Sequence, residues 1–132
     1  LNSEGEYRGE IRNNRPEGYG EWHGDCDYLG YFEQGVFSTE GWLKTEEFTY
    51  QGAFQDGKPQ GQGTMFYAKG EVYFGEFVDG EREGQGTMLY ADNKVYQGMW
   101  KDGKRHGQGV LFNEVTQLSG TWKNDFYKKE QD

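Results

Sequence analysis

The chain has 132 residues, which suits a single domain and is short for two. Leu, Ile, Val and Phe number 22 in total and the formal net charge is -9, a combination that is typical of disordered proteins. Aromatic residues, however, make up 17% of the chain, and disordered segments are poor in them. We therefore expect an ordered chain, and its acidic charge argues against nucleic acid as a partner.

The cysteine content and the first residues of the chain indicate the cellular compartment. Cys26 is the single cysteine, so it cannot form an intramolecular disulfide, and no apolar run is long enough to cross a bilayer. These features favour a reducing, cytoplasmic setting. The opening residues LNSEGEYRG have no signal-peptide pattern and the chain does not begin with Met, so we expect a piece of a longer protein.

A repeat of 21 to 23 residues begins near the N-terminus, and its first two units are diverged. Counting the first tyrosine of a unit as position 0, residues 7–27 have Asn14 at position 7, where glycine is expected; asparagine tolerates a positive φ. Residues 28–49 have Thr39 at position 11, another glycine position, followed by the segment KTEEF without a clear turn. This second unit predicts a bulge or bend in the repeat.

Three regular units follow, at residues 50–72, 73–95 and 96–117. Each has glycine at positions 2, 7, 11 and 13, which places it at residues 52, 57, 61, 63, 75, 80, 84, 86, 98, 103, 107 and 109. A partial sixth unit, residues 118–125, completes one repeat domain of residues 1–125, with a tail at 126–132. We expect Phe126 and Tyr127 to cover the last strand edge, and Lys128 and Lys129 to oppose sheet extension, as edge charges do.

Each unit predicts two short strands. In YFGEFV the period of two puts Tyr73 and Phe77 on one face, and Asp79-Gly80 opens a glycine-rich turn because glycine accepts positive φ. GTMLY forms the second strand, and a second turn returns the chain to the next tyrosine. Gly75 leaves space into which an aromatic ring from a neighbouring strand can lean. The fold is therefore predicted to be all-β, an elongated, twisted and curved single-layer antiparallel meander of hairpins.

The spacing Tyr-x-Gly-x-aromatic followed by Gly-x-x-x-Gly-x-Gly resembles the MORN repeat, the membrane occupation and recognition nexus motif. YQGMWKDGKRHGQG, residues 96–109, is the best match, and the resemblance covers about residues 7–122. It implies stacked hairpins in a curved sheet and a role as a scaffold that holds a helix or peptide of a partner protein. It also implies cytoskeletal or ciliary assemblies, self-association, phosphoinositide binding, or regulation of an attached enzyme.

Both faces of the predicted sheet carry apolar residues, and a single layer cannot bury both. Exposed apolar area of this kind marks a partner site, and aromatic side chains serve well as interface anchors. We predict a non-catalytic protein-interaction scaffold with an aromatic groove, with acids at Glu33, Glu76 and Asp79 on its rim favouring a basic helix or peptide. The predicted groove residues are Tyr50, Phe54, Tyr73, Phe77, Met88, Tyr96, Trp100 and Glu76.

Two alternatives stay open. Lys101, Lys104 and Arg105 lie in one turn region and are candidate contacts for phosphoinositide or other lipid headgroups, although acids are interleaved with the basic residues. The chain is alternatively a regulatory repeat domain of a larger enzyme. No cofactor, metal or catalytic site is predicted: the glycine spacing fails the phosphate-loop pattern, and His23, His106 and Cys26 are too few for a metal set.

Overall fold

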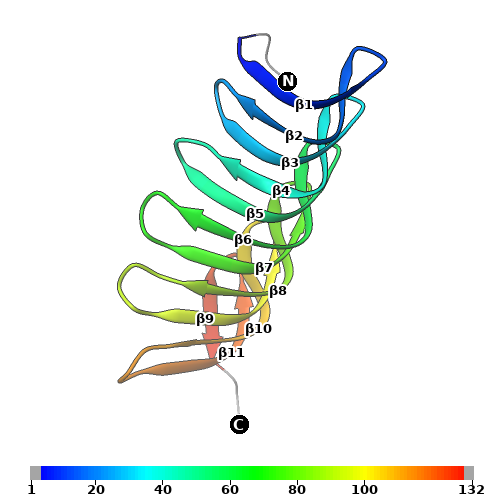
Figure 1. Ribbon diagram of the computed structural model, residues 1–132. Coiled ribbons are helices and arrows are strands. Elements are labelled where there is room, and N and C mark those ends of the chain that lie inside the picture. Colours follow the sequence, from blue (N-terminus) through cyan, green and yellow to red (C-terminus); the bar gives the residue numbers. More distant parts are fainter. Residues whose placement is uncertain (1–3, 130–132) are drawn as a thin grey trace.

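The computed structural model describes residues 4–129 as a single antiparallel sheet in which each strand pairs with the next one along the chain (Figure 1). Residues 1–3 and 130–132 of the predicted domain and tail lie outside the described part. No helix occurs among the described residues, and none that could span a membrane is found there. The strands are β1 (Glu6–Arg12), β2 (Arg15–His23), β3 (Asp27–Glu33), β4 (Val36–Lys44), β5 (Phe48–Gln55), β6 (Lys58–Tyr67), β7 (Val72–Val78), β8 (Glu81–Leu89), β9 (Val95–Lys101), β10 (Lys104–Phe112), β11 (Gln117–Lys123) and β12 (Phe126–Lys129).

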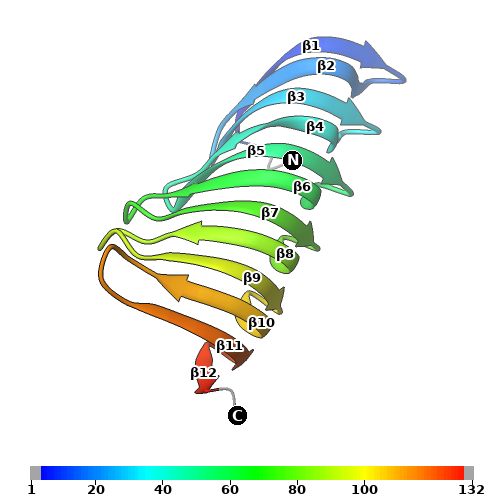
Figure 2. The same ribbon diagram turned by 90° about the horizontal axis from the view of Figure 1, so that it is seen from below.

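The predicted all-β meander is confirmed, and the sheet is open at both ends. The strands arch rather than run flat, and successive hairpins stack along the ribbon (Figures 1 and 2). Residues 126–129 form β12, which pairs with β11, whereas the sequence predicted a tail from residue 126. Tyr127 packs against Trp122 at 5.1 Å between ring centroids, so the partial sixth unit forms a second strand because its aromatic residue continues the packing.

The turns follow from residues that accept a left-handed backbone. Asp79 and Gly80 have φ of 50° and 84°, as a two-residue type I′ hairpin turn requires. The strand resumes at once at Glu81, so Gly84, at φ 64°, lies in a bulge of β8 and not in the turn predicted there. Asn14, which stands where glycine is expected, has a φ of 62°, the positive value that was predicted.

The second unit keeps its place in the sheet despite its irregular sequence. Thr39 has φ 64° and lies in a bulge of β4 like the one formed by Gly84 in β8. The KTEEF segment does form a turn: the Oγ1 atom of Thr45 accepts hydrogen bonds from the amides of Glu47 and Phe48, each at 3.1 Å. The predicted bulge is therefore a feature of every full unit, and the second unit reproduces it with a β-branched residue.

A row of glycines crosses the sheet. Paired glycines face one another from Gly9 on β1 to Gly120 on β11 without a break, through positions 2 and 13 of each unit. A Cβ on Gly75 would stand 2.8 Å from the hydroxyl of Tyr73, and one on Gly86 would collide with it. The space beside Gly75 is therefore filled by Tyr73 of the same strand, and not by an aromatic residue leaning in from a neighbouring strand as predicted. Gly86 does receive a ring from a neighbouring strand, because Tyr73 reaches over it from β7.

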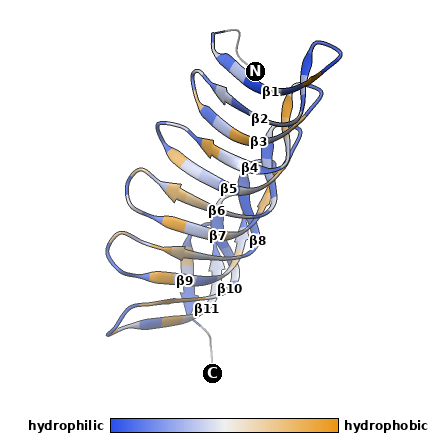
Figure 3. Ribbon diagram, in the orientation of Figure 1, coloured by the Kyte–Doolittle hydropathy of each residue, from blue (hydrophilic) through white to orange (hydrophobic). Residues whose placement is uncertain are grey.

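The core is a ladder of aromatic rings on one face, which we call the aromatic face. Neighbouring rings contact edge to face, with 5.0 to 5.4 Å between their centroids. The ring at position 0 of a unit contacts the ring at position 4 of the same unit and the ring at position 4 of the next unit. The hydroxyl of each tyrosine donates to the carbonyl three residues later, as Tyr73 does to Glu76 at 2.9 Å. Apolar segments recur on successive strands in Figure 3. The ladder comprises Tyr7, Phe32, Tyr28, Phe54, Tyr50, Phe77, Tyr73, Trp100, Tyr96 and Trp122.

Candidate functional site

The apolar residues predicted to line a groove all belong to this core. Each is at most 4% exposed, which leaves almost no surface for contact with a partner. A single sheet buries them because its rings pack against one another and against the side chains at positions 9 and 15, such as Pro59 and Met65. The buried set is Tyr50, Phe54, Tyr73, Phe77, Met88, Tyr96 and Trp100. These residues hold the fold together, and the exposed apolar side chains must be sought on the other face.

Burial also sets the protonation of the ladder. It raises the pKa of Tyr50 and Tyr96 to about 12, so both phenols are neutral over the ordinary pH range. Neutral hydroxyls can donate to the backbone carbonyls of Ala53 and Met99, at 2.8 and 2.9 Å. The ladder is thus a structural element with no ionised group offered to a ligand.

Two arginines pack over the rings of the core in its C-terminal half. The guanidinium carbon of Arg82 lies 4.9 Å from the Trp100 ring centroid, and that of Arg105 lies 4.6 Å from Trp122. Arg105 also donates to the carbonyl of Asp125 at 2.9 Å. Of the three predicted lipid contacts, Lys101 and Lys104 are exposed, while Arg105 is half-buried and engaged in these contacts.

The predicted rim acids lie in three different settings. The carboxylate of Glu76 accepts the amide hydrogen of Gln85 at 2.9 Å and so closes the bulge of β8. Glu33 accepts from the hydroxyl of Ser38 at 3.2 Å, and Asp79 forms the β7–β8 turn, where its amide donates to Gln60. These three acids are therefore parts of turns and bulges, and they do not line a common cavity.

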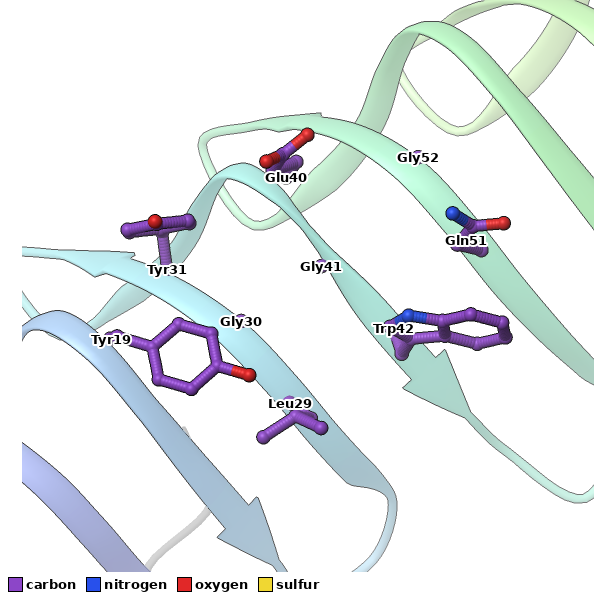
Figure 4. A pocket seen from close by; sticks show the side chains of 9 residues that line it. All are labelled: Tyr19, Leu29, Gly30, Tyr31, Glu40, Gly41, Trp42, Gln51 and Gly52. Atoms are coloured by element: carbon purple, nitrogen blue, oxygen red, sulfur yellow. The ribbon is translucent and has the colours of Figure 1, made fainter.

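The face opposite the aromatic ladder carries a hollow of about 230 Å³ between β2 and β5. Its floor is the backbone of the glycine row, and its walls are side chains at the outward positions on either side (Figure 4). We call this the β2–β5 hollow. Its lining consists of Tyr19, Leu29, Tyr31, Glu40, Trp42 and Gln51, with Gly30, Gly41 and Gly52.

The aromatic walls of the β2–β5 hollow remain accessible. Tyr19 is 50%, Tyr31 41% and Trp42 49% exposed, in contrast to the nearly complete burial of the ladder. The Tyr19 and Tyr31 rings contact edge to face at 5.5 Å with 76° between their planes. Figure 4 shows these side chains arranged around the backbone of Gly30 and Gly41. Because glycine has no side chain, the floor stays open to a ligand.

A second hollow continues the first along the ribbon and shares Gln51 and Gly52 with it. Phe74, which is 44% exposed, forms its far end on β7. We call this the β5–β7 hollow. Its lining consists of Gln51, Gly52, Gln62, Gly63, Thr64, Phe74 and Gly75. The two hollows together form a trough that crosses six strands.

Charge in the trough is sparse and negative. Among the described residues that line the two hollows, Glu40 alone carries a charged side chain. The Glu40 carboxylate makes no hydrogen bond or ion pair with residues 4–129, unlike Glu10 and Glu76, which each cap a bulge amide. A carboxylate in this state, beside aromatic rings, can receive a cationic group.

Other reactive groups do not assemble into a site. Within residues 4–129, no group of three or more His, Cys, Asp or Glu side chains is placed to hold a metal ion. His23 has a raised pKa because it hydrogen bonds to Asp27, with a smaller contribution from Glu21. Burial raises the pKa of the Cys26 thiol, and Asp25 and Asp27 add to the effect, so this thiol is poorly nucleophilic.

The residues of the β2–β5 hollow were missed in the sequence, although a signal was present. Position 3 is Tyr31 in the second unit and Glu, Ala, Glu and Met in the other full units; position 14 is Trp42 and otherwise Glu, Thr, Thr and Val. The second unit also has Glu40 at position 12, where the three regular units have Gln. Comparing outward positions between units would have singled out this unit.

The comparison with protein families agrees with the repeat. The family model of the MORN repeat matches residues 7–25, 50–72, 73–95 and 96–112, more than half of the chain. No curated protein matches the chain. The interval between the first and second match contains β3 and β4, which supply Tyr31, Glu40 and Trp42 to the hollow. The predicted resemblance is confirmed: the chain belongs to the MORN repeat family.

Proposed function

We propose that this MORN repeat domain is a non-catalytic protein-interaction scaffold that holds a helix or extended peptide of a partner in its glycine-floored trough. The observation that carries the proposal is the row of exposed apolar side chains beside an open backbone floor, from Tyr19 to Phe74. Exposed apolar side chains grouped on one face in this way are typical of partner sites. Exposed aromatic rings also make effective anchors at interfaces.

The dimensions of the trough suit a polypeptide segment. It runs from β2 to β7, five strand spacings or about 24 Å, which is the length of about 16 residues of α-helix. The exposed side chains of Gln51 and Gln62 lie between Trp42 and Phe74 and offer hydrogen-bond partners to a peptide backbone. The net charge of -9 and Glu40 favour a basic segment.

The wider setting is carried over from the family alone. We propose a cytoplasmic location and a place in a cytoskeletal or ciliary assembly, with self-association through the ribbon as a further role. The membrane-surface alternative depends on Lys101 and Lys104, because Arg105 is held against Trp122. In the regulatory alternative the segment in the trough belongs to an attached enzyme, so the same surface is used.

The proposal is tested by selecting peptides of about 16 residues from a random display library on the immobilised chain. Wild-type chain should enrich related peptides with apolar and basic residues. The selected peptides should bind a Trp42→Ser, Phe74→Ser variant at least tenfold more weakly, because anchor residues dominate interface energies. A Val115→Ser, Phe126→Ser variant is the matched control, since these exposed apolar residues lie outside the trough.

The outcomes separate the alternatives. Equal binding to the wild type and both variants would place the partner site elsewhere on the chain. Failure to enrich any peptide, together with binding to anionic vesicles that is lost in Lys101→Gln, Lys104→Gln, would favour the membrane-surface alternative. Both variants should keep the β circular dichroism of the wild type, because all the substituted side chains are exposed.

A further inference from the structure

We propose that the β2–β5 hollow is a site for an organic cation, namely the lysine or arginine side chain of the bound segment, with a methylated lysine as the best ligand. Tyr19, Tyr31 and Trp42 would surround the cation and Glu40 would balance its charge. This inference deepens the proposed function and rests on it, because the cation is presented by the segment in the trough.

The aromatic walls are the first support. Aromatic rings attract a cation within about 6 Å of the ring centre, and cages of such rings bind quaternary ammonium groups. Tyr19 and Tyr31 are in edge-to-face contact, and Trp42 lies across the glycine floor from them (Figure 4). These rings take no part in the aromatic ladder and remain about half exposed, so the fold itself leaves their faces available.

The charge in the hollow is the second support. Glu40 lies in the bulge of β4, and its carboxylate forms no hydrogen bond or ion pair with residues 4–129. Two neighbouring acids are already occupied: Glu10 accepts the amide of Tyr19 at 2.8 Å, and Glu21 faces His23 at 3.5 Å. Lys44, two residues beyond Trp42 on β4, is cross-strand from Asp27. Glu40 is therefore the group free to compensate a bound cation.

The size of the hollow is the third support. At about 230 Å³ it is smaller than the roughly 300 to 1,000 Å³ that is usual for sites of whole small molecules. A single side chain fits within it, while the rest of the segment continues along the floor into the β5–β7 hollow. A methylated ammonium fits this setting because its surface is apolar and its charge is diffuse, so it loses little hydration.

Only one unit carries this set of residues. Aromatic rings at positions 3 and 14 and a glutamate at position 12 occur together in the second unit and in none of the other full units. A general apolar surface would not need them in combination. The coincidence of rings and carboxylate at one point of the trough is the arrangement that a cation site requires.

The test uses the whole chain and blocked amino-acid amides as probes: trimethyllysine, lysine, arginine, and the neutral isostere of trimethyllysine in which carbon replaces the ammonium nitrogen. Binding is followed by the fluorescence of Trp42, the exposed tryptophan, and by the NMR shift of the probe's methyl groups. We expect saturable binding of trimethyllysine, roughly fivefold tighter than that of the neutral isostere. Arginine and lysine should fall between them.

Variants locate the site. Glu40→Gln and Tyr31→Leu should each weaken trimethyllysine binding roughly three- to tenfold, because each removes one part of the cation's surroundings. Phe74→Leu is the matched control, an exposed aromatic on the same face whose loss should leave binding unchanged. Unchanged circular dichroism in all three variants excludes unfolding as the cause of a loss.

Equal affinity for the cation and its neutral isostere would overturn the inference and leave a merely apolar hollow. Absence of binding by every probe would overturn it too. Neither result changes the outcome of the peptide selection, so the failure of the cation site is distinguishable from the failure of the scaffold. Enriched peptides without a basic residue opposite Glu40 would likewise contradict the cation site while supporting the trough.

Discussion

Tyr73 lies directly over Gly86, the glycine of the next strand, and donates a 2.9 Å hydrogen bond to the carbonyl of Glu76. The tyrosine ring occupies the space that a side chain at residue 86 would need. The same relation links Tyr50 with Gly63 and Tyr96 with Gly109. Tyrosine at position 0 and glycine at position 13 are thus two halves of one packing unit, which explains why they recur together.

Gly86→Ala is expected to destabilise the chain by about 1 to 3 kcal/mol, because the new methyl group overlaps the Tyr73 ring. In a Tyr73→Phe background part of this loss should disappear, since the hydroxyl is the nearest atom. Gly80→Ala is the control: it has open space but a φ of 84°, so its cost of about 1 kcal/mol should be the same in both backgrounds. Urea unfolding measures all four differences, and simple additivity for Gly86 would contradict the contact.

Stability should fall at alkaline pH because of the tyrosine ladder. Burial raises the pKa of Tyr50 and Tyr96 from 10.0 to about 12, so the folded chain holds protons that the unfolded chain releases. Their contribution is complete below pH 10 and is lost as the pH rises from 10 towards 12. Urea unfolding at a series of pH values should show a smaller alkaline decline in Tyr50→Phe, Tyr96→Phe than in the wild type. Identical declines would show that other groups are responsible.

Arg82→Lys should cost about 1 to 2 kcal/mol despite conserving the charge. The guanidinium stacks near Trp100 and donates to the Tyr67 hydroxyl at 3.0 Å and to the Gly103 carbonyl, and an ammonium group cannot reproduce this planar arrangement. Lys104→Gln, on the exposed edge of the same region, should change stability by less than about 0.5 kcal/mol. Thermal unfolding of the two variants provides the comparison. Equal effects would argue against the stacking.

Thr39→Gly should stabilise the chain by about 1 kcal/mol. Thr39 adopts a φ of 64°, which is costly for a β-branched residue and free of strain for glycine. The same substitution at Thr49, in the extended strand β5, should instead destabilise by about 0.5 to 1 kcal/mol. The midpoints of urea unfolding of the two variants show whether each substitution raises or lowers stability. A loss of stability at residue 39 would indicate that its side chain makes a contact worth more than the strain.

Trp42 should account for nearly all the quenching of tryptophan fluorescence by iodide. It is 49% exposed, whereas Trp22, Trp100 and Trp122 are at most 5% exposed. Trp42→Phe should therefore abolish most of the quenching and shift the emission to shorter wavelength. Trp100→Phe should leave the quenched component intact. Persistent quenching without Trp42 would mean that one of the buried tryptophans reaches solvent, which would contradict their packing in the core.

The repeated meander could be read from the sequence because its causes are local. Alternation in YFGEFV sets which residues share a face, and the burial of both Tyr73 and Phe77 confirms the face predicted for them. Asp79-Gly80 suits a two-residue turn. Alternation alone, however, does not say which face is covered. The predicted groove residues were therefore placed on the face that forms the core.

The sequence by itself determined the repeat, the strand and turn positions and the two faces, since each depends on residues a few positions apart. Only the tertiary structure decided which face is buried and which residues meet. Burial of Tyr50 at 0% exposure requires rings from neighbouring hairpins, and the β2–β5 hollow requires Tyr19, Tyr31 and Trp42 from three strands. Such contacts depend on register and on the arching of the strands, which are properties of the assembled sheet.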